Sequence, residues 1–530
     1  MLNPYKASFH LCTLVFSVNV FSKIILIFVF LPAHFLASQE PASAELQNKP
    51  APSKDAVFVI RNWAYFITGK TKASSIEREG NFITGERFSG QAELDAYIKE
   101  KKQDLYNIRA LLSDENSITY TLGEAEEDGA IPVYLEITVA DSTSFIIIPE
   151  PNYDSNYGFS LSLKFRDYNF LGTLSPQKLD FIWGSDDRSR NYIGYKLELD
   201  IPFRAFGFNW FFTSNNELRY YFSGEPTYNI NNLGLAMELP VSFTTFTFGL
   251  EQGVVIHEEN TRKIRDFEST TDEYHDWYLE SKAYTDWKIP TPLKAGKFGA
   301  IVYTPGVYGI AKYQPNGDVG DFRRGPGAGF RQDVGFERID WIGNFRQGLK
   351  VSVFNDNEYN FFRKTWIYNF GFLGEGHIRI SNLFGISGRI LYTRWINDFY
   401  EYAGDVIRGY KDNELAAKER LSVNLEFPFR LIRFVPSEWT GNRKYRFFDF
   451  EQHWSLFVDF VMLDCPYNNY GFKPNDIITG AGLEVITFPL YWRSFYLRIS
   501  AGWNVREWAR TGKPPSGIFR EIYIGMGHYY

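Results

Sequence analysis

Residues 521–530, EIYIGMGHYY, alternate large apolar side chains with polar or small ones along the whole segment. Ile522 and Ile524 fall on one side of an extended chain, and Glu521 and Gly525 on the other. Because successive side chains of a β-strand point to opposite faces, this segment would form a strand with one apolar wall and one polar wall. Such a strand separates an apolar environment from a wet one.

The same alternation recurs in short segments from about residue 157 onward, for example in residues 192–201, YIGYKLELDI, and residues 421–427, LSVNLEF. Charged side chains on the second face of many strands suit a water-filled lumen. Only a closed barrel lets such strands cross a bilayer with every backbone group paired. The sequence therefore predicts an all-β transmembrane barrel of about 16 antiparallel strands. A soluble sandwich would alternate too, but this continuous meander is too long for one sandwich core.

The composition fits a barrel with a wet interior. Aromatic residues make up 18% of the chain, yet the mean hydropathy is negative, at -0.28. Aromatic girdles at the membrane surfaces account for the first value, and charged residues that face the lumen account for the second. The net charge of -7 is mild for 530 residues and argues against a nucleic-acid partner.

The N-terminal residues have the pattern of export and linker segments. Residues 1–38 place lysines ahead of the apolar run 24–36 and end in small residues, which predicts a secretory signal peptide; an uncleaved anchor is the alternative. Residues 39–55 are rich in proline and alanine and are expected to form a linker. Because Cys12 lies in the signal segment, Cys465 is alone in the mature chain, which predicts neither an internal disulfide nor a thiol metal site.

A different pattern predicts a small N-terminal α+β domain over residues 56–150, with the barrel assigned to residues 151–530. The domain should contain a strand, a helix capped by Ser89, and a hairpin. These elements are expected at residues 56–69, 91–112, 118–122 and 131–139.

Four segments resemble a known family. The runs I-T-G-K-T at residues 67–71 and L-Y-N-I-R-A-L-L at residues 105–112 resemble a polypeptide-transport-associated (POTRA) domain. Residues 153–158, YDSNYG, and 167–173, DYNFLGT, are similar to the first barrel strand and first hairpin of the BamA/TamA superfamily, and Gly172 lies in that hairpin. This superfamily, the bacterial surface antigen family, contains outer-membrane assembly and secretion barrels. The resemblance implies a bacterial outer-membrane barrel with its N-terminal domain in the periplasm.

A tetrapeptide resembles the superfamily's arginine-glycine-aromatic motif at the tip of the sixth extracellular loop: Ile407, Arg408, Gly409 and Tyr410. The resemblance implies that Asp459, on a later strand, is the acidic partner of Arg408. Asp459 also alternates with apolar neighbours so that its carboxylate should face the lumen, where a planar guanidinium can make two parallel bonds to it. Separate solvated charges are the alternative. In a partly wet lumen, loss of the pair should cost about 1–3 kcal/mol.

The closing strand ends in an aromatic residue, Tyr530, which is similar to the recognition signal of assembled outer-membrane barrels. Segmentation gives roughly seventeen strands, roughly twelve of them before the Arg408 loop, whereas a barrel with both ends periplasmic needs an even number. A kink at Pro240 that imitates a turn is the expected source of the odd count. The chain also has one POTRA-like unit, while the principal assembly factors carry several.

Three functions fit these features: assembly of outer-membrane proteins, secretion of one polypeptide through the lumen, and a plain pore. The POTRA-like domain disfavours the pore, because exposed sheet edges can pair with an extended client strand. The expected function is non-enzymatic assembly, in which a client strand adds to the edge at residues 131–139. It then templates on a seam where residues 159–165 meet residues 522–530. Expected partners are unfolded outer-membrane polypeptides, the lipid bilayer, and periplasmic chaperones or lipoproteins, with no cofactor or metal.

Overall fold

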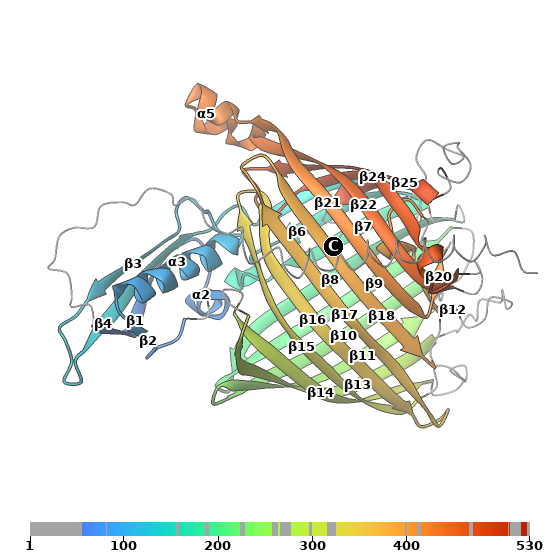
Figure 1. The fold of residues 1–530 in the computed structure, drawn as a ribbon, viewed down its shortest axis with the longest axis horizontal. Helices are drawn as coiled ribbons and strands as arrows, with labels where there is room; N and C mark the ends of the chain where they lie inside the picture. Colours follow the sequence, from blue (N-terminus) through green and yellow to red (C-terminus); the bar gives the residue numbers. More distant parts are fainter. Residues whose placement is uncertain are drawn as a thin grey trace, which may run out of the picture.

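The computed structural model describes residues 56–80, 82–154, 158–185, 190–222, 228–256, 263–264, 277–295, 299–314, 325–397, 400–410, 415–465, 470–506, 508 and 521–526. An α+β domain is followed by a closed β-barrel, and the domain lies against one end of the barrel (Figure 1). In this part of the chain, no helix is both long enough and apolar enough to cross a membrane.

The N-terminal domain is a four-stranded sheet, in the order β2-β1-β4-β3, packed against two helices. Its elements are β1 (Val57–Thr68), α2 (Ala73–Gly80), β2 (Arg87–Ser89), α3 (Gln91–Asn107), β3 (Ser117–Leu122) and β4 (Ala130–Ala140). Phe58 and Ile60 of β1 and Leu94 and Leu105 of α3 are almost fully buried in its core. The expected apolar face of the helix is therefore the face that packs on the sheet.

Three expectations for this domain are wrong. The helix ends at Asn107, well before residue 112, because Ile108 is extended and the amide of Leu112 donates to Ala140 of β4. Gly90 is the N-cap, and Ser89 instead donates its amide to the Glu93 carboxylate at 2.6 Å. The strand at residues 131–139 is not an edge, since β4 pairs with β1 on one side and β3 on the other.

The barrel has 18 antiparallel strands, not about 16. They are β5 (Phe145–Asp154), β6 (Gly158–Asp167), β7 (Gln177–Ser185), β8 (Asn191–Ala205), β9 (Phe208–Tyr221), β10 (Tyr228–Val241), β11 (Thr244–Ile256), β13 (Trp277–Lys294), β14 (Ala300–Tyr313), β15 (Gly327–Ile342), β16 (Phe345–Asn360), β17 (Thr365–Arg379), β18 (Gly385–Ile396), β21 (Glu419–Phe434), β22 (Phe450–Cys465), β24 (Ile478–Pro489), β25 (Leu497–Asn504) and β26 (Glu521–Met526). The two-residue strand β23 (Tyr470–Gly471) pairs antiparallel with the end of β22.

The odd number of strands expected from the sequence results from β5, because its sequence FIIIPEPNYD does not show the alternation of a strand. Pro149 and Pro151 cannot donate to a ladder and are typical of edges, so the segment does not read as a barrel strand. The expected kink at Pro240 is a genuine turn between β10 and β11, with Ser242 at a positive φ of 57°. The expected domain boundary at residues 150–151 falls inside β5, which already belongs to the barrel.

The two faces of the barrel wall differ as the alternation predicts. Along β22, Trp454 and Leu456 point outward and are 38% and 63% exposed, while Ser455, Phe457 and Asp459 point inward and are at most 3% exposed. These inward side chains are shielded from solvent, so another part of the chain must occupy the lumen next to β22.

The ring closes between β26 and β5, where the described residues pair only as Tyr153 with Ile524 and Asp154 with Tyr523. By contrast, β5 and β6 pair along their whole length. The expected seam between residues 159–165 and the last strand is therefore wrong: those residues belong to β6, which has β5 and β7 as neighbours. The seam edge of β5 is poorly suited to pairing because Pro149 and Pro151 lack amide donors.

Candidate functional site

The loop between β18 and β21 folds into the lumen and covers its inner wall. It contains β19 (Tyr400–Tyr402), η4 (Gly404–Val406) and β20 (Ala416–Ala417), and β19 also pairs with β12 (Lys263–Ile264). An apolar cluster joins loop and wall: Ala403, Val406, Ile407, Tyr410, Leu415 and Ala417 from the loop, and Leu391, Val461, Leu463, Cys465 and Ile478 from the wall. Burial of these apolar side chains contributes to holding the loop inside the barrel.

At the loop tip, the structure brings Arg408 and Asp459 together. The Nε and Nη2 atoms of Arg408 donate to the two carboxylate oxygens of Asp459 at 2.9 and 2.8 Å, and the Arg408 backbone amide donates at 2.9 Å. Arg408 is 1% exposed and Asp459 is 0% exposed. The sequence expectation of a partly wet pair is therefore wrong, since this ion pair is dry.

Three further side chains complete the group, which we call the Arg408 clamp: Glu426, Phe457 and Glu484. Nη1 of Arg408 donates to Glu426 at 2.5 Å and lies 3.8 Å from Glu484, and the guanidinium lies 3.7 Å from the centre of the Phe457 ring. Glu484 is also paired with Arg498 at 2.8 Å. A buried arginine with three carboxylates in reach is held much more firmly than a single surface pair.

The register of the wall explains why these side chains meet. Glu426, Phe457 and Gly482 stand opposite one another on β21, β22 and β24, and Asp459 stands opposite Gly480 in the next row. The sequence pattern did not single out Glu426 and Glu484, although each alternates with apolar residues as Asp459 does. That alternation gives a side chain's direction, but only the register gives its neighbours.

Glycines form a slot in which the loop backbone lies flat on the wall. Gly409 has a φ of 93°, which favours glycine, and a Cβ there would meet the backbone of Trp503. A Cβ on Gly480 would overlap the carbonyl oxygen of Arg408, and one on Gly502 would meet the amide of Gly409. Any larger residue at these wall positions would push the tip away from Asp459.

Substitution Gly480→Ala is expected to loosen the loop. Overpacking a well-packed site typically costs about 1–3 kcal/mol, so the population of the released state should rise about fivefold to 150-fold above wild type. The rate of trypsin cleavage after Arg408, which is sequestered in the clamp, measures this release. Gly309→Ala is the matched control, because a Cβ at Gly309 meets nothing within 4 Å. Equal cleavage rates in the two variants would contradict the slot.

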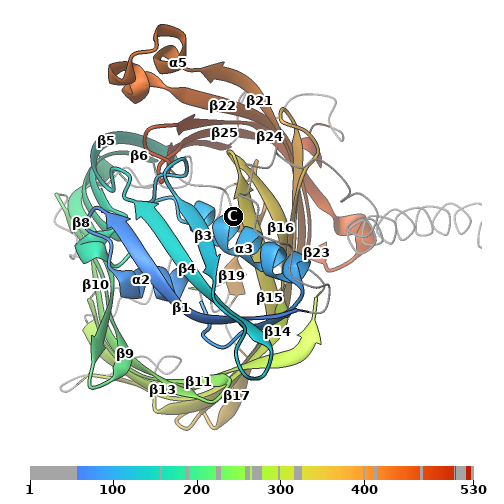
Figure 2. The ribbon, with the colours of Figure 1, turned by 90° about the vertical axis from the view of Figure 1, so that its left-hand side faces the viewer.

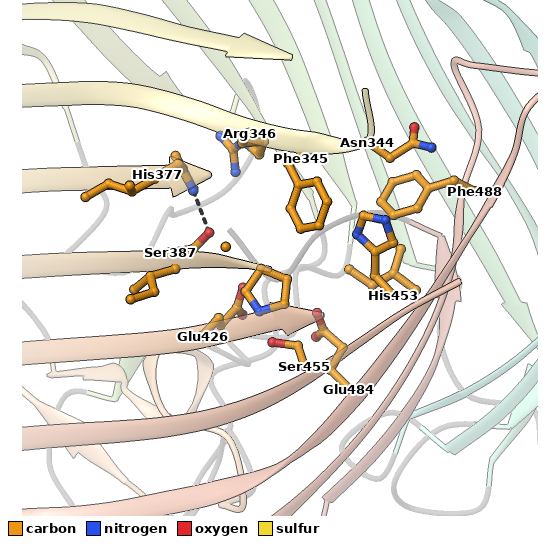
Figure 3. A pocket seen from close by; sticks show the side chains of 15 residues that line it. Asn344, Phe345, Arg346, His377, Ser387, Glu426, His453, Ser455, Glu484 and Phe488 are labelled. Atoms are coloured by element: carbon orange, nitrogen blue, oxygen red, sulfur yellow. Dashed lines mark hydrogen bonds between the residues drawn. The ribbon is translucent and has the colours of Figure 1, made fainter. Parts of the chain in front are cut away.

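Beside the clamp lies a small pocket of the inner wall that includes Glu426 and Glu484 (Figure 3). His453 packs there between the rings of Phe345 and Phe488, at centroid distances of 4.5 and 4.9 Å. These three rings bring β16, β22 and β24 together in the pocket.

The same pocket contains a hydrogen bond between Nδ1 of His377 and Oγ of Ser387, 2.8 Å apart (Figure 3). Among the residues that the structure describes, no group of three or more His, Cys, Asp or Glu side chains could hold a metal ion.

Gly172 connects the barrel to the N-terminal domain. It lies in η2 (Phe170–Gly172), between β6 and β7, which is the second hairpin and not the first because β5 precedes it. Its carbonyl accepts hydrogen bonds from the Lys72 amide and the Ser75 hydroxyl, both at 2.9 Å, and its φ is 76°. A Cβ at this position would overlap the carbonyl of Lys70. Gly172 is thus needed where the two units touch.

A second contact holds the end of α3 against the barrel. The guanidinium of Arg109 lies 4.3 Å from the Trp341 ring centre and donates to the Arg493 carbonyl, and the Asn107 side chain donates to Asp340 at 2.9 Å. Burial, and then the nearby Arg493 guanidinium, lower the pKa of Arg109 to about 10. These contacts fix the domain across one mouth of the barrel (Figure 2).

Three of the expected features lie outside the residues that the structure describes. Tyr530 lies outside the described residues, as do residues 1–55, so the signal peptide, the linker and the terminal aromatic remain predictions. Ile407 and Tyr410 are 0% and 5% exposed and belong to the loop–wall cluster, so all four residues of the loop motif lie inside the barrel.

No protein-family model matches this chain, and no curated protein matches it either. Among solved structures, it is similar to BamA from Haemophilus ducreyi lacking POTRA domains 1-3 (12% identity, TM-score 0.37, 89% of this chain and 84% of that one). It is also similar to CdiB from Acinetobacter baumannii (10%, 0.46, 89% and 73%) and CdiB from Escherichia coli (10%, 0.39, 99% and 99%). All three TM-scores are below 0.5, so these likenesses do not assign a function to the chain.

Proposed function

We propose that this chain is a bacterial outer-membrane protein that assembles other outer-membrane barrels, as members of the BamA/TamA superfamily do, without enzymatic chemistry. A continuous apolar outer face supports the membrane location: outward residues such as Leu161, Trp183, Leu250 and Leu456 are between 41% and 66% exposed. Exposed apolar surface of this extent is costly in water and suits lipid. Antiparallel ladders pair the strand backbones around the ring, as a bilayer requires, and the described part of the β26–β5 seam is the weakest of them.

The observation that carries the assembly proposal is the short seam between β26 and β5. A client strand can add to an edge by main-chain hydrogen bonds only where two barrel strands separate. Among the described residues, β26 and β5 share two residue pairs, whereas every other neighbouring pair of the 18 strands shares at least six. Separation here breaks few bonds, and the new client strand replaces them. The work is then hydrogen-bond exchange at the seam.

In this proposal, the N-terminal domain is a periplasmic POTRA-like receptor for the client. Its sheet offers β3 as a free edge, because β3 pairs only with β4 among the described strands. Unfolded outer-membrane polypeptides and the lipid bilayer are the proposed partners, with chaperones or lipoproteins delivering the clients. A client held on β3 lies at the mouth where Arg109 and Gly172 fix the domain (Figure 2).

Secretion of a polypeptide through the lumen is the second candidate. The part of the inner wall away from the clamp favours it: the ion pair of Arg331 with Asp286 joins side chains that are 35% and 19% exposed, and that of Lys312 with Glu280 joins side chains that are 30% and 31% exposed. Partly exposed charged side chains suit a water-filled path through which a polar chain can pass. A chain that uses this path needs the loop to leave its slot.

Depletion of the protein is expected to lower the folded amount of a set of outer-membrane barrels severalfold, because their insertion loses its template. Quantitative proteomics of heat-modifiable outer-membrane proteins measures the effect, and lipoproteins in the same membrane serve as the internal control. An unchanged barrel proteome together with one polypeptide retained in the periplasm would favour secretion instead.

A further inference from the structure

A compact helical connection joins β21 to β22 at the end of the barrel that carries the N-terminal domain. We call it the foot; it consists of α5 (Pro436–Thr440) and η6 (Arg443–Phe448) with their flanking residues 435, 441–442 and 449. Both views place it outside the ring of strands, away from the lumen (Figures 1 and 2). It is built as an ordered unit, since Asp449 accepts from both the amide and the hydroxyl of Ser437 and Val435 is 3% exposed.

The foot exposes large aromatic side chains that a water-facing turn would not need. Trp439, Tyr445, Phe447 and Phe448 are 64%, 44%, 53% and 58% exposed, within ten residues of one another. Phe447 also packs on Trp492 of the β24–β25 turn, with ring centres 4.7 Å apart. Part of this aromatic surface therefore packs on the barrel, and the exposed remainder can contact a partner outside the protein.

The apolar surface of the foot continues the outward face of the barrel. A bulge between Arg430 and Ile432 adds Leu431 to β21, after which Ile432 and Phe434 lie opposite outward residues of β22. The Trp439 ring then stands edge-on to Phe434, with centroids 5.0 Å apart. Apolar exposure thus runs unbroken from the barrel wall onto α5.

Basic residues lie beside these aromatics. Arg443 and Lys444 are exposed, whereas Glu438 is paired with Arg433 at 2.7 Å and Asp449 is buried. Aromatic rings with adjacent cations are typical of segments that lie at the membrane surface, where the rings enter the headgroup region and the cations meet phosphate.

From this continuity and this charge, we propose that the foot binds anionic phospholipid headgroups of the periplasmic leaflet and fixes the depth of the barrel near its seam. The proposal rests on the membrane location proposed above. Two other turns at this end of the barrel each carry one exposed aromatic residue, Phe206 (91%) and Phe243 (71%), which would make a smaller contact with the same headgroups. The foot is separated from the seam by β24, β25 and β26.

The test uses the full chain with Cys12 and Cys465 replaced by serine, reconstituted into vesicles of phosphatidylethanolamine and phosphatidylglycerol. An environment-sensitive fluorophore is attached to one new cysteine at a time: Trp439→Cys or Phe448→Cys in the foot, Leu456→Cys on the outer wall, and Glu127→Cys in the β3–β4 turn. Nitroxide lipids carry the quencher either near the headgroup or near the chain end. Heat-modifiable migration confirms that each variant has folded.

Both foot positions are expected to be quenched about threefold more strongly by the headgroup nitroxide than by the chain-end one, as suits an interfacial segment. Leu456 should show the reverse preference and Glu127 almost no quenching. Foot probes as weakly quenched as Glu127 would overturn the lipid assignment and leave a periplasmic protein as the occupant, while strong quenching at Leu456 would keep the membrane barrel. Loss of quenching at Leu456 as well would overturn the membrane location itself.

Charge reversal separates anionic headgroups from lipid in general. The pair Arg443→Glu with Lys444→Glu should reduce foot quenching severalfold in phosphatidylglycerol vesicles and little in pure phosphatidylcholine, since each cation near an anionic surface contributes about fivefold in binding. The matched control reverses Lys99 and Lys102, which are exposed on α3. Equal losses in both kinds of vesicle would overturn the headgroup assignment.

Discussion

A disulfide between positions 153 and 524 is expected to abolish client insertion completely, and a reductant should restore it. Tyr153 and Ile524 stand directly opposite each other where β5 meets β26. Opposite residues of antiparallel strands have Cα atoms about 4.5–5.5 Å apart, which is within the span of a disulfide. The double variant Tyr153→Cys with Ile524→Cys, in a background with Cys465→Ser, therefore closes the seam covalently. The measurement is the folding rate of a urea-unfolded outer-membrane barrel into liposomes that contain this protein.

The control is a second lock in the same barrel. Leu161 and Trp183 are opposite residues of β6 and β7 and face outward, so Leu161→Cys with Trp183→Cys should form a disulfide without touching the seam. This control is expected to keep full activity under oxidising conditions. If the seam-locked protein also stays fully active, the seam does not open in function, and passage through the lumen becomes the better explanation.

The alternation of side chains was enough to predict the barrel, because the lipid-facing and lumen-facing walls place opposite demands on successive residues. It failed at β5, where Pro149 and Pro151 interrupt the pattern of a strand that still pairs along its full length with β6. Missing that strand made the count odd, shifted the domain boundary and placed the seam one strand too far along. The same two prolines weaken the seam edge, so the sequence signal failed at the strand on which the proposed function depends.

For the site, the sequence predicted one contact of several. The pair of Arg408 and Asp459 could be predicted because the loop motif resembles that of the superfamily and because the alternation around Asp459 places its carboxylate in the lumen. Glu426, Glu484 and the glycine slot depend on how the loop crosses four strands, and single-chain patterns carry no information on that register. The burial of the pair was also misjudged, since the apolar residues that exclude water come from the loop itself and pack on the wall only after the loop has folded into the lumen.

Substitution Arg408→Ala is expected to cost about 3–5 kcal/mol of unfolding free energy, more than the 1–3 kcal/mol expected for a wet lumen, because it leaves a buried carboxylate without its partner. Asp459 is 0% exposed and Glu484 is 1% exposed, so neither can be rehydrated while the loop stays in place. The loop should therefore leave the wall, and trypsin should reach residues near the tip. Urea unfolding of the detergent-solubilised barrel measures the free energy.

Arg331→Ala is the matched control, since Arg331 also makes a two-pronged pair with an aspartate, Asp286, but one that is partly wet and far from the loop. Its loss should cost no more than about 1 kcal/mol. A double-mutant cycle of Arg408→Ala and Asp459→Ala should give a coupling of about 2–3 kcal/mol, because each single change strands the other group in a dry site. Additive single changes would mean that the carboxylates of Glu426 and Glu484 hold the arginine without Asp459. The arginine would then be held by the combined negative charge of several carboxylates and not by one specific partner. A charge-swapped barrel with Arg408→Asp and Asp459→Arg would in that case fail to hold its loop against the wall.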